Sequence, residues 1–403
     1  MPDNGTNGKA TRTSDTNEPS DSTLAKAGRS RSDSSRISNS RRSMLKAVGA
    51  ASAAGLLSGC LGMGSGSETT INVLTWEEYG EITDDIADDL GINIEVTSST
   101  SGADMFSTWN AGEYEQYDIA VPDNNYVQRF ADADLIEPVN RDIVSNYDNI
   151  YENFKNLSQN QFSASENNVW GAPMRFGWNG YSYDSRAIPD HEASWSVLFE
   201  DTFDDVDLDG EIVMFDDHYK AMSATALYLG YEEAFEGEKV TLSSDQIEEV
   251  KQTLIDQKPR LQGYIAQDPS YIQDFNQGNF LIGQSGRNEI VEMWSNGTDW
   301  PVMTAPSEGA LAWFEVAVVS TASDSKETAW EVVNEFISPE YGAKLAQAGF
   351  SPSVNPNTQQ ELSDEENELF GSVDPKMVES FIPFKSVSNE EAWLEAWEEV
   401  KAA

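Results

Sequence analysis

Residues 71–96 read INVLTWEEYGEITDDIADDLGINIEV, and this stretch decides the fold class. The β-branched run at 71–74 predicts a short strand, and the apolar spacing across 81–90 predicts a helix. Gly91 is placed to end that helix, and residues 92–96 predict a second strand. A strand, a helix and a second strand in succession are typical of a mostly parallel sheet with helices on both faces.

The same alternation of strands and helices continues along the chain. We expect the extended aromatic segment at 171–183 to carry the chain into a second lobe, and the apolar strand at 311–319 to bring it back. Further strands are expected at 117–121, 135–136, 211–215 and 280–283, and further helices at 104–111, 126–133, 221–229, 244–257, 326–337 and 390–400.

The chain length also indicates two lobes, because about 340 residues follow Cys60 and exceed what one hydrophobic core usually serves. We expect residues 71–175 and 308–350 to form lobe 1, and residues 176–307 and 351–403 to form lobe 2. The predicted fold class is therefore α/β with two lobes. Each lobe is a mostly parallel sheet flanked by helices, and a ligand cleft lies between them.

The first 59 residues predict a disordered leader that ends in an export signal. Residues 1–39 are polar and have too few apolar positions to bury a core. Residues 40–46 read SRRSMLK and residues 57–60 read LSGC, which resembles a twin-arginine signal joined to a lipoprotein cleavage box. The apolar run at 47–61 between them is shorter than the roughly 18 to 20 residues of a membrane span.

Lipidation of Cys60 is the expected outcome of this signal. It places the protein on the extracellular face of the cell membrane, with residues 60–70 as a flexible, lipid-anchored linker. Cys60 is also the only cysteine of the chain, so no thiol remains for a disulfide, a metal ion or nucleophilic catalysis.

The excess of acidic residues indicates adaptation to a high-salt habitat more than it indicates the charge of a ligand. The chain has 25 Lys and Arg against 70 Asp and Glu, and after residue 60 the balance is 16 against 65, a formal net charge of −49. Such a surface repels nucleic acid and anionic lipid headgroups. Excess carboxylates keep a protein hydrated in very high salt, where screening weakens their repulsion, so a halophilic protein is expected.

Catalysis is difficult to build from these residues. His191 and His218 are the only histidines, and the GQSG at 283–286 departs from a nucleophile elbow at its last position. Gly-rich phosphate loops are absent from the sequence as well. We therefore expect no enzyme, no cofactor and no metal; the rival is a secreted enzyme that uses Asp217 or Glu315 as acid or base.

One acidic segment has the opening pattern of a calcium loop. Residues 205–210 read DVDLDG, and Ile212 and Asp216 fall where such a loop has an apolar residue and its last carboxylate. The strand expected at 211–215 does not fit the second half of an EF-hand. We therefore favour a solvated turn over a calcium site.

Ligands of open α/β sheets bind beyond the carboxyl ends of the strands. This rule nominates four loops, at 75–79, 122–125, 216–220 and 313–315. The first of them reads TWEEY and places two aromatic side chains at this edge of the sheet.

At these loops the sequence resembles the polyamine-binding proteins of ABC importers, a branch of the type II periplasmic binding-protein fold. A strand that ends in Trp-x-x-Tyr, as at 75–79, opens the mature domain of that family, and the likeness runs through most of residues 71–355. The other matching motifs are YDIAVP at 117–122, WGAP at 170–173, PSEG at 306–309 with WFE at 313–315, and GFSP at 349–352.

The resemblance implies how a polyamine would be held. A polyamine is an apolar chain with cationic ends, which suits aromatic faces along its length and carboxylates at its ammonium groups. The implied aromatic faces are Trp76, Tyr79 and Trp313. The implied partners of the ammonium groups are Asp217 and Glu315, and the resemblance implies that Asp123 and Asn125 line the cleft from lobe 1. Two positions differ from the family pattern: Gln284 stands where the family usually has Trp, and Phe350 stands where it usually has Tyr.

Three bases depart from this pattern. Lys220 stands where the family has a glutamate, and Arg175 and Arg287 also fall near the expected cleft. Bases that gather at a cleft in so acidic a chain indicate a carboxylate or other anionic group on the ligand. The alternative is that they pair with neighbouring acids such as Asp216, Asp217 and Glu289.

The sequence therefore predicts the substrate-binding lipoprotein of an ABC importer, which captures a putrescine- or spermidine-like polyamine between two lobes and delivers it to permease subunits. The alternative is the same transport role for a zwitterionic or anionic amine-containing solute, such as an amino acid or a derivative of one. A surface sensor with the same binding step is a third possibility. We expect a monomer that does not bind nucleic acid.

Overall fold

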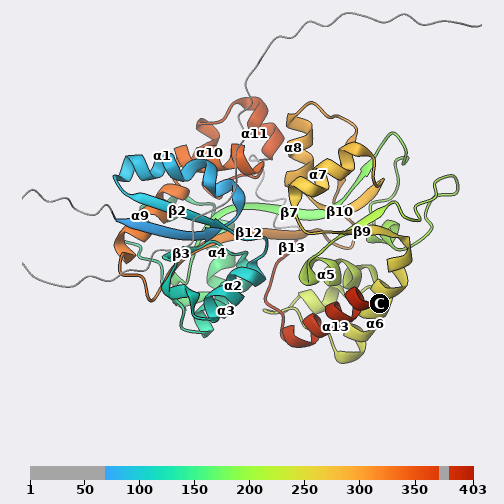
Figure 1. Cartoon of the computed structure of the whole chain (residues 1–403), viewed down its shortest axis with the longest axis horizontal. Coiled ribbons are helices and arrows are strands. Elements are labelled where there is room, and N and C mark those ends of the chain that lie inside the picture. Colours follow the sequence, from blue (N-terminus) through green and yellow to red (C-terminus); the bar gives the residue numbers. More distant parts are fainter. Residues whose placement is uncertain (1–68, 372–380) are drawn as a thin grey trace, which may run out of the picture. The chain divides into compact units, whose positions relative to one another are not determined.

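The computed structural model describes residues 69–371 and 381–403. The predicted leader, Cys60 and most of the predicted linker lie outside the described residues. The described chain falls within one compact unit, and its hydrophobic side chains gather in two large cores that share a continuous sheet (Figure 1).

The predicted strand, helix and strand at the start of the domain are confirmed. They are β1 (Thr70–Thr75), α1 (Gly80–Leu90) and β2 (Asn93–Ser98), and β1 pairs with β2 in parallel. The start of β1 alternates, with Ile71 and Val73 buried and Thr70 and Asn72 half-buried, as expected for a strand. The short strand β3 (Ile119–Ala120) pairs in parallel with the other side of β1.

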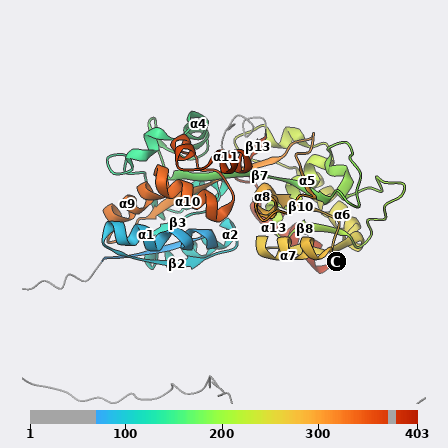
Figure 2. The ribbon, with the colours of Figure 1, turned by 90° about the horizontal axis from the view of Figure 1, so that it is seen from above.

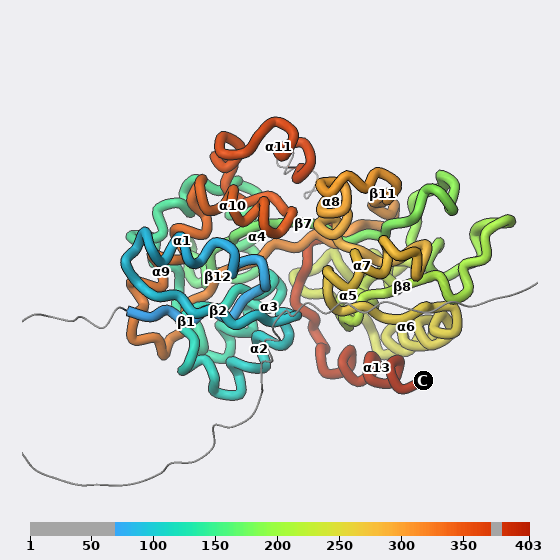
Figure 3. Tube along the Cα trace, turned by 45° about the horizontal axis from the view of Figure 1, so that its top comes forward, coloured from blue at the N-terminus to red at the C-terminus, as the bar shows by residue number. Residues whose placement is uncertain are grey.

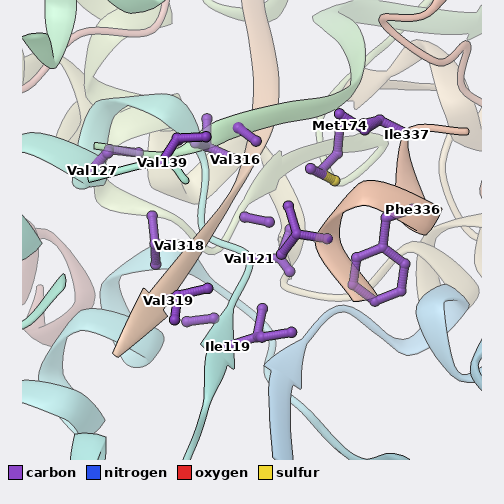
Figure 4. Close-up of a cluster of buried hydrophobic side chains, with 14 of the residues drawn as sticks. Ile119, Val121, Val127, Val139, Met174, Val316, Val318, Val319, Phe336 and Ile337 are labelled. Carbon is purple, nitrogen blue, oxygen red and sulfur yellow. The ribbon is translucent and has the colours of Figure 1, made fainter. Parts of the chain in front are cut away.

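Helices on both faces of these strands complete the first core. The bounds of these helices are α2 (Gly102–Asn110), α3 (Asn124–Asp132), α4 (Glu152–Gln161), α9 (Lys326–Phe336) and α10 (Pro339–Gly349). Figure 4 shows side chains of this core, among them Ile119 of β3, Val318 and Val319 of a crossing strand, and Phe336 of α9.

Two long strands belong to both lobes. They are β7 (Ala172–Asp184) and β12 (Leu311–Ser320), and they pair in antiparallel fashion, as the extended segments in the sequence predict. On β7, Phe176 packs in the first core and Tyr181 in the second. The two lobes are therefore joined by ordered, fully buried sheet, which Figure 2 shows between the two groups of helices.

The second lobe repeats the arrangement of the first. Its central strand β8 (Ile212–Phe215) pairs in parallel with β9 (Leu261–Ile265) and β10 (Ile282–Gly286), and β10 joins β7. Helices α5 (His218–Tyr228), α6 (Ser244–Gln257), α7 (Asp268–Gln277), α8 (Arg287–Ser295) and α13 (Glu390–Ala402) cover it. The last helix, α13, lies against α6 (Figure 3).

The remaining described elements are short. They are β4 (Ile136–Glu137), β5 (Ser163–Ser165), β6 (Asn168–Val169), β11 (Pro301–Thr304), β13 (Ile382–Pro383), α11 (Asp364–Phe370) and seven 3-10 turns, of which Glu77–Tyr79 follows β1. Eleven described strands form one sheet in the order β2-β1-β3-β12-β7-β10-β8-β9, with β11 beside β7 and with β4 and β13 beside β12.

The segment after α10 differs from the expected division of the lobes. Val354 packs in the first core, and Ser353 bridges Arg175 on β7, so the chain does not enter the second lobe at residue 351. Farther on, Phe370 of α11 packs with Val291 of α8 in a small separate cluster. Side chains of residues 382–400 then pack in the second core.

Candidate functional site

A cavity of about 510 Å³ is lined by residues of both lobes. Each of the four segments nominated in the sequence contributes to it, through Trp76, Asp123, Lys220 and Glu315 respectively. The segment at 313–315 is not a loop as expected, because it lies inside β12. Its other lining residues are Glu77, Glu78, Glu81, Ser98, Ser99, Thr100, Arg175, Asn179, Phe215, Ala266, Gln267, Asp268, Pro269, Asn288, Glu289, Glu292, Trp313, Ala348, Gly349 and Phe350.

Arg175 and Glu315 form a buried ion pair in the wall of this cavity. The guanidinium of Arg175 donates from Nε to Oε2 of Glu315 and from Nη2 to Oε1, both at 2.7 Å. Nη1 donates to the carbonyl of Gly349 at 3.1 Å, and Nη2 also pairs with Glu78. Arg175 is 4% exposed and Glu315 2%, so the guanidinium is bound to acids of this chain.

Tyr79 supports the same carboxylate from behind. Its hydroxyl donates to Oε2 of Glu315 at 2.7 Å, and its ring packs edge-on against Phe336 at 5.2 Å between centroids. Burial, together with the charge of Glu315, raises the pKa of Tyr79 well above its ordinary value. Tyr79 is not among the residues that line the cavity, so here it is a support for Glu315 rather than an aromatic face.

Aromatic side chains nevertheless line the cavity. Trp313 lies across Gly177 on the neighbouring strand β7, where a Cβ would come within 2.4 Å of the indole ring. Glycine at this position therefore allows the ring to lie flat on the sheet. Trp76, Phe215 and Phe350 complete the aromatic set, and Phe350 ends α10 in the left-handed conformation (φ 52°), which is uncommon for a side chain of this size.

Lys220 is the second base of the cavity, and it is surrounded by acids. Its Nζ lies 4.7 Å from the centroid of the Phe215 ring, and no carboxylate oxygen of the described residues comes within 4.0 Å of it. Burial acts to lower the pKa of Lys220, but the charges of Asp217 and Asp123 outweigh it, so the pKa is raised. Asp217 caps α5 by accepting the backbone N–H of Lys220 at 2.8 Å, and it lies outside the cavity lining.

Two buried carboxyl groups of the cavity have strongly raised pKa values. Burial raises the pKa of Asp123 to about 7; Lys220 opposes this shift, and Glu315 and Asp217 add to it. Burial and the charge of Asp268 raise the pKa of Glu289 to about 8. Desolvation penalises the charged form of each carboxyl, and a cation brought next to it would restore that form.

Three other predicted residues do not line the cavity. Asn125 is buried in α3, and its Oδ1 has no hydrogen-bond partner among the described residues. Gln284 accepts from the backbone N–H of Phe215 at 3.3 Å and donates to the carbonyl of Lys220 at 2.9 Å, so it fixes the cavity loops from behind. Arg287 donates to the carbonyls of Leu369 and Phe370 at the end of α11.

None of the three bases singled out in the sequence pairs with the acids suggested there. Asp216 pairs instead with Lys401 at 2.6 Å, Asp217 caps a helix, and Glu289 has no ion pair among the described residues. Burial lowers the pKa of Arg287 to about 10, and the two backbone carbonyls take the place of a carboxylate.

Sequence reasoning missed most of the acids of the second lobe. Asp268 and Glu289 line the cavity from the first turns of α7 and α8, and Glu292 from the second turn of α8; the sequence analysis does not predict these two helices. A usable signal was present, because Asp268-Pro269 is a typical helix start and follows an apolar strand.

The lining is strongly acidic as a whole. Eight of its residues are acids (Glu77, Glu78, Glu81, Asp123, Asp268, Glu289, Glu292 and Glu315), and two are bases (Arg175 and Lys220). A cavity of this composition with aromatic walls favours cations that also have apolar surface.

The calcium-like segment lies elsewhere and its acids have other partners. Residues 201–209 and Arg260 line a separate cavity of about 410 Å³, in which Arg260 pairs with Asp201 at 2.8 Å and with Asp209 at 3.1 Å. Across residues 69–371 and 381–403, no group of three or more His, Cys, Asp or Glu side chains is arranged to hold a metal ion.

Two α/β lobes that share crossing strands, with a cavity between them, define a binding protein of the type II periplasmic class. The sequence pattern of the family described as bacterial extracellular solute-binding protein matches residues 81–370. The chain belongs to this family. In the described part of the chain, no helix has both the length and the apolar character needed to cross a membrane.

Individual relatives agree with this assignment. The chain is 22% identical over 320 residues to the spermidine/putrescine-binding periplasmic protein of Escherichia coli, which covers 77% of this chain and 86% of that protein. The TpPotD lipoprotein of Treponema pallidum has the same fold, with a TM-score of 0.68, 17% identity, and coverage of 82% of this chain and 99% of that one. The PBP MotA of A. tumefaciens B6, solved in complex with glucopine, gives a TM-score of 0.64, 11% identity, and coverage of 83% and 100%.

Proposed function

We propose that this protein is the substrate-binding component of an ABC importer, and that it captures a putrescine- or spermidine-like polyamine between its lobes for delivery to a permease. The observation that carries the proposal is the cavity lining, with eight acids, two bases and four aromatic side chains. One of the two bases, Arg175, is already bound by Glu78 and Glu315. The remaining charged groups that line the cavity therefore have a negative net charge.

The residue types suit the chemistry of a polyamine. Trp76 and Trp313 offer faces to an apolar methylene chain, and cation–π attraction adds where an ammonium approaches such a face. Carboxylates that lack a base can pair with the ammonium groups. The name of the E. coli relative supports the same class of ligand.

A second candidate ligand is favoured by Lys220. Its ammonium lies in the cavity without a carboxylate oxygen within 4.0 Å among the described residues, and Nε1 of Trp76 also has no hydrogen-bond partner there. Two such donors suit a solute that has a carboxylate as well as an amine. The alternative is therefore transport of an amino acid or a derivative of one.

The proposal also includes the location of the protein. Twin-arginine export and lipidation of Cys60 would hold it on the extracellular face of the membrane, where it acts as a monomer in very high salt. The signal pattern at 40–60 supports this proposal, as does the description of the Treponema pallidum neighbour as a lipoprotein. Mass spectrometry of the protein from its own membranes tests it, because a diacylglyceryl group on Cys60 adds a defined mass.

Isothermal titration of the mature protein in concentrated salt tests the ligand. We expect putrescine and spermidine to bind, and amino acids to give no heat. If the polyamines give no heat while an amino acid binds, the polyamine assignment fails and the alternative replaces it.

A further inference from the structure

Three side-chain oxygens converge above Gly286, at the start of α8. A Cβ placed on Gly286 would lie 2.4 Å from Oε2 of Glu289, 2.4 Å from Oδ1 of Asn288 and 3.2 Å from Oδ1 of Asn179. That point is one bond from the Cα of Gly286, so no ligand atom occupies it; the three oxygens flank Gly286, and the side chains of Asn179, Asn288 and Glu289 all line the 510 Å³ cavity. The second lobe therefore presents a set of hydrogen-bond acceptors to the cavity.

The carboxyl group of Glu289 is buried and has an oxygen without a partner among the described residues. The nearby backbone N–H groups of Glu289 and Gly286 act to lower its pKa, but burial outweighs them. Oε2 has no hydrogen-bond partner among the described residues, although Glu289 is only 2% exposed. Asn179 is equally buried, and its Nδ2 is also without a partner in the described chain. Oε2 of Glu289 is an acceptor, and leaving it buried without a donor is costly unless a ligand supplies one; Nδ2 of Asn179 is a donor, with which an ammonium does not pair.

The neighbouring groups make these oxygens suit a cation. Nδ2 of Asn288 donates to Asp268 at 2.6 Å, which leaves its Oδ1 as the atom near Gly286. The charged groups that act on Glu289 are Asp268, from α7, and Lys220, from α5. A primary ammonium has three donor hydrogens, and the three acceptor oxygens grouped beside Gly286 match that number.

We propose that Glu289, Asn288 and Asn179 form an ammonium subsite in the second lobe, which receives one terminal ammonium of the ligand. This inference rests on the proposed function and adds residues that the sequence analysis does not name as ligand-binding. It also replaces Asp217 and Glu315 as the expected partners of this ammonium group, because Glu315 is already paired with Arg175 and Asp217 caps α5. The methylene chain then follows the aromatic faces that line the same cavity.

Titration of Glu289→Gln against Glu292→Gln tests the subsite. Both changes remove one acid of α8 that lines the cavity, but only Glu289 contributes an oxygen near Gly286. We expect Glu289→Gln to weaken putrescine binding about 10- to 100-fold, as the loss of a charged hydrogen bond does. Glu292→Gln should weaken it less than about threefold in concentrated salt, which screens longer-range attraction.

Butylamine, a monoamine, is the control for the number of ammonium groups on the ligand. Putrescine should bind the wild type more tightly than butylamine does, and Glu289→Gln should reduce that advantage. Gly286→Ala is the second variant, because its methyl group meets Glu289 and Asn288 at 2.4 Å without changing charge, and it should weaken putrescine binding in the same way. Thermal unfolding of each variant confirms that the loss is not one of folding.

The outcomes separate the two proposals. A wild type that binds no polyamine overturns the proposed function. A wild type that binds putrescine, together with equal losses in Glu289→Gln and Glu292→Gln, overturns the subsite alone. So does a divalent cation that binds the wild type, fails to bind Glu289→Gln and competes with putrescine, because the three oxygens would then be a metal site.

Discussion

Arg175 on β7 and Glu315 on β12 are joined by two parallel hydrogen bonds of 2.7 Å, and this pair fastens together the two strands that connect the lobes. Glu315 lies where the register of the two strands shifts, between Phe314 and Val316. The carboxylate that the sequence nominates for the ligand thus has a guanidinium and the Tyr79 hydroxyl as partners within the chain.

Arg175→Met should destabilise the protein strongly, because it leaves Glu315 buried without its base. Breaking a buried ion pair from one side typically costs about 3 to 5 kcal/mol. Denaturant unfolding in concentrated salt measures the change. The double variant Arg175→Met with Glu315→Gln removes the uncompensated charge and should recover part of the loss. Simple addition of the two single effects would contradict a direct pairing.

Trp313→Ala should weaken polyamine binding by about 1 to 2 kcal/mol, or roughly 5- to 30-fold, because it removes a cation–π face. Gly177→Ala is a matched probe of the same ring, since the added methyl would lie 2.4 Å from it and displace it. Titration with putrescine should show a loss for both variants. Unchanged affinity in both would place the ligand elsewhere.

Lys220→Glu decides between the two ligand classes. Among the described residues, Lys220 is the cavity base without an ion pair, and the change puts a carboxylate in its place among acids that include Asp123 and Asp217. For a polyamine, the change should raise affinity; for a solute with a carboxylate, it should abolish binding. Lys220→Met serves as the control, because it removes the charge without adding an acid and should shift affinity in the same direction by less.

Protein stability should fall as pH rises from about 5 to 8. Burial raises the pKa of Asp123 from 3.8 to about 7 and that of Glu289 from 4.5 to about 8, so in this window the folded state binds more protons than the unfolded state. Stability then decreases with increasing pH. Thermal unfolding across this range should show a smaller decrease in Glu289→Gln, whereas Asp299→Asn, which changes an exposed acid outside the cavity, should leave the slope as it is.

Polyamine binding should release protons near neutral pH. Glu289 is largely protonated below pH 8 without a cation beside it, and an ammonium at Oε2 stabilises the carboxylate. Affinity should therefore rise between pH 6 and 8, while the amines stay charged. Titration in buffers with different ionisation enthalpies counts the released protons. An equal count in the wild type and in Glu289→Gln would argue against Glu289 as their source.

The first lobe could be predicted well because its elements are local. The β-branched run at 71–74 and the helix that stops before Gly91 gave β1 and α1 to within one residue at most ends, and parallel pairing followed from the alternation. The rule that ligands lie beyond the carboxyl ends of strands then brought Trp76 and Asp123 to one cavity.

Part of the second lobe was harder to predict, because two of its helices are short and polar. Residues 268–277 and 287–295 form α7 and α8, yet few of their positions are apolar and buried, so periodicity gives a weak signal. Glu289 could not be nominated without α8. The partners of Arg175 were equally inaccessible, because the residues that bind it lie 97 to 174 positions away along the chain.

The burial of Arg175 and Glu315 has a consequence for how the protein responds to salt. Dissolved ions weaken charge pairs only where solvent reaches them, so a pair such as Lys344 with Asp85, at 36% and 61% side-chain exposure, fades as salinity increases. The buried ion pair of Arg175 and Glu315 in the cavity wall keeps its strength at low and at high salt concentration, because solvent ions do not reach it. One wall of the cavity therefore keeps its shape at any ionic strength. The attraction of its solvent-accessible carboxylates for a cationic ligand, in contrast, weakens as the salt concentration rises.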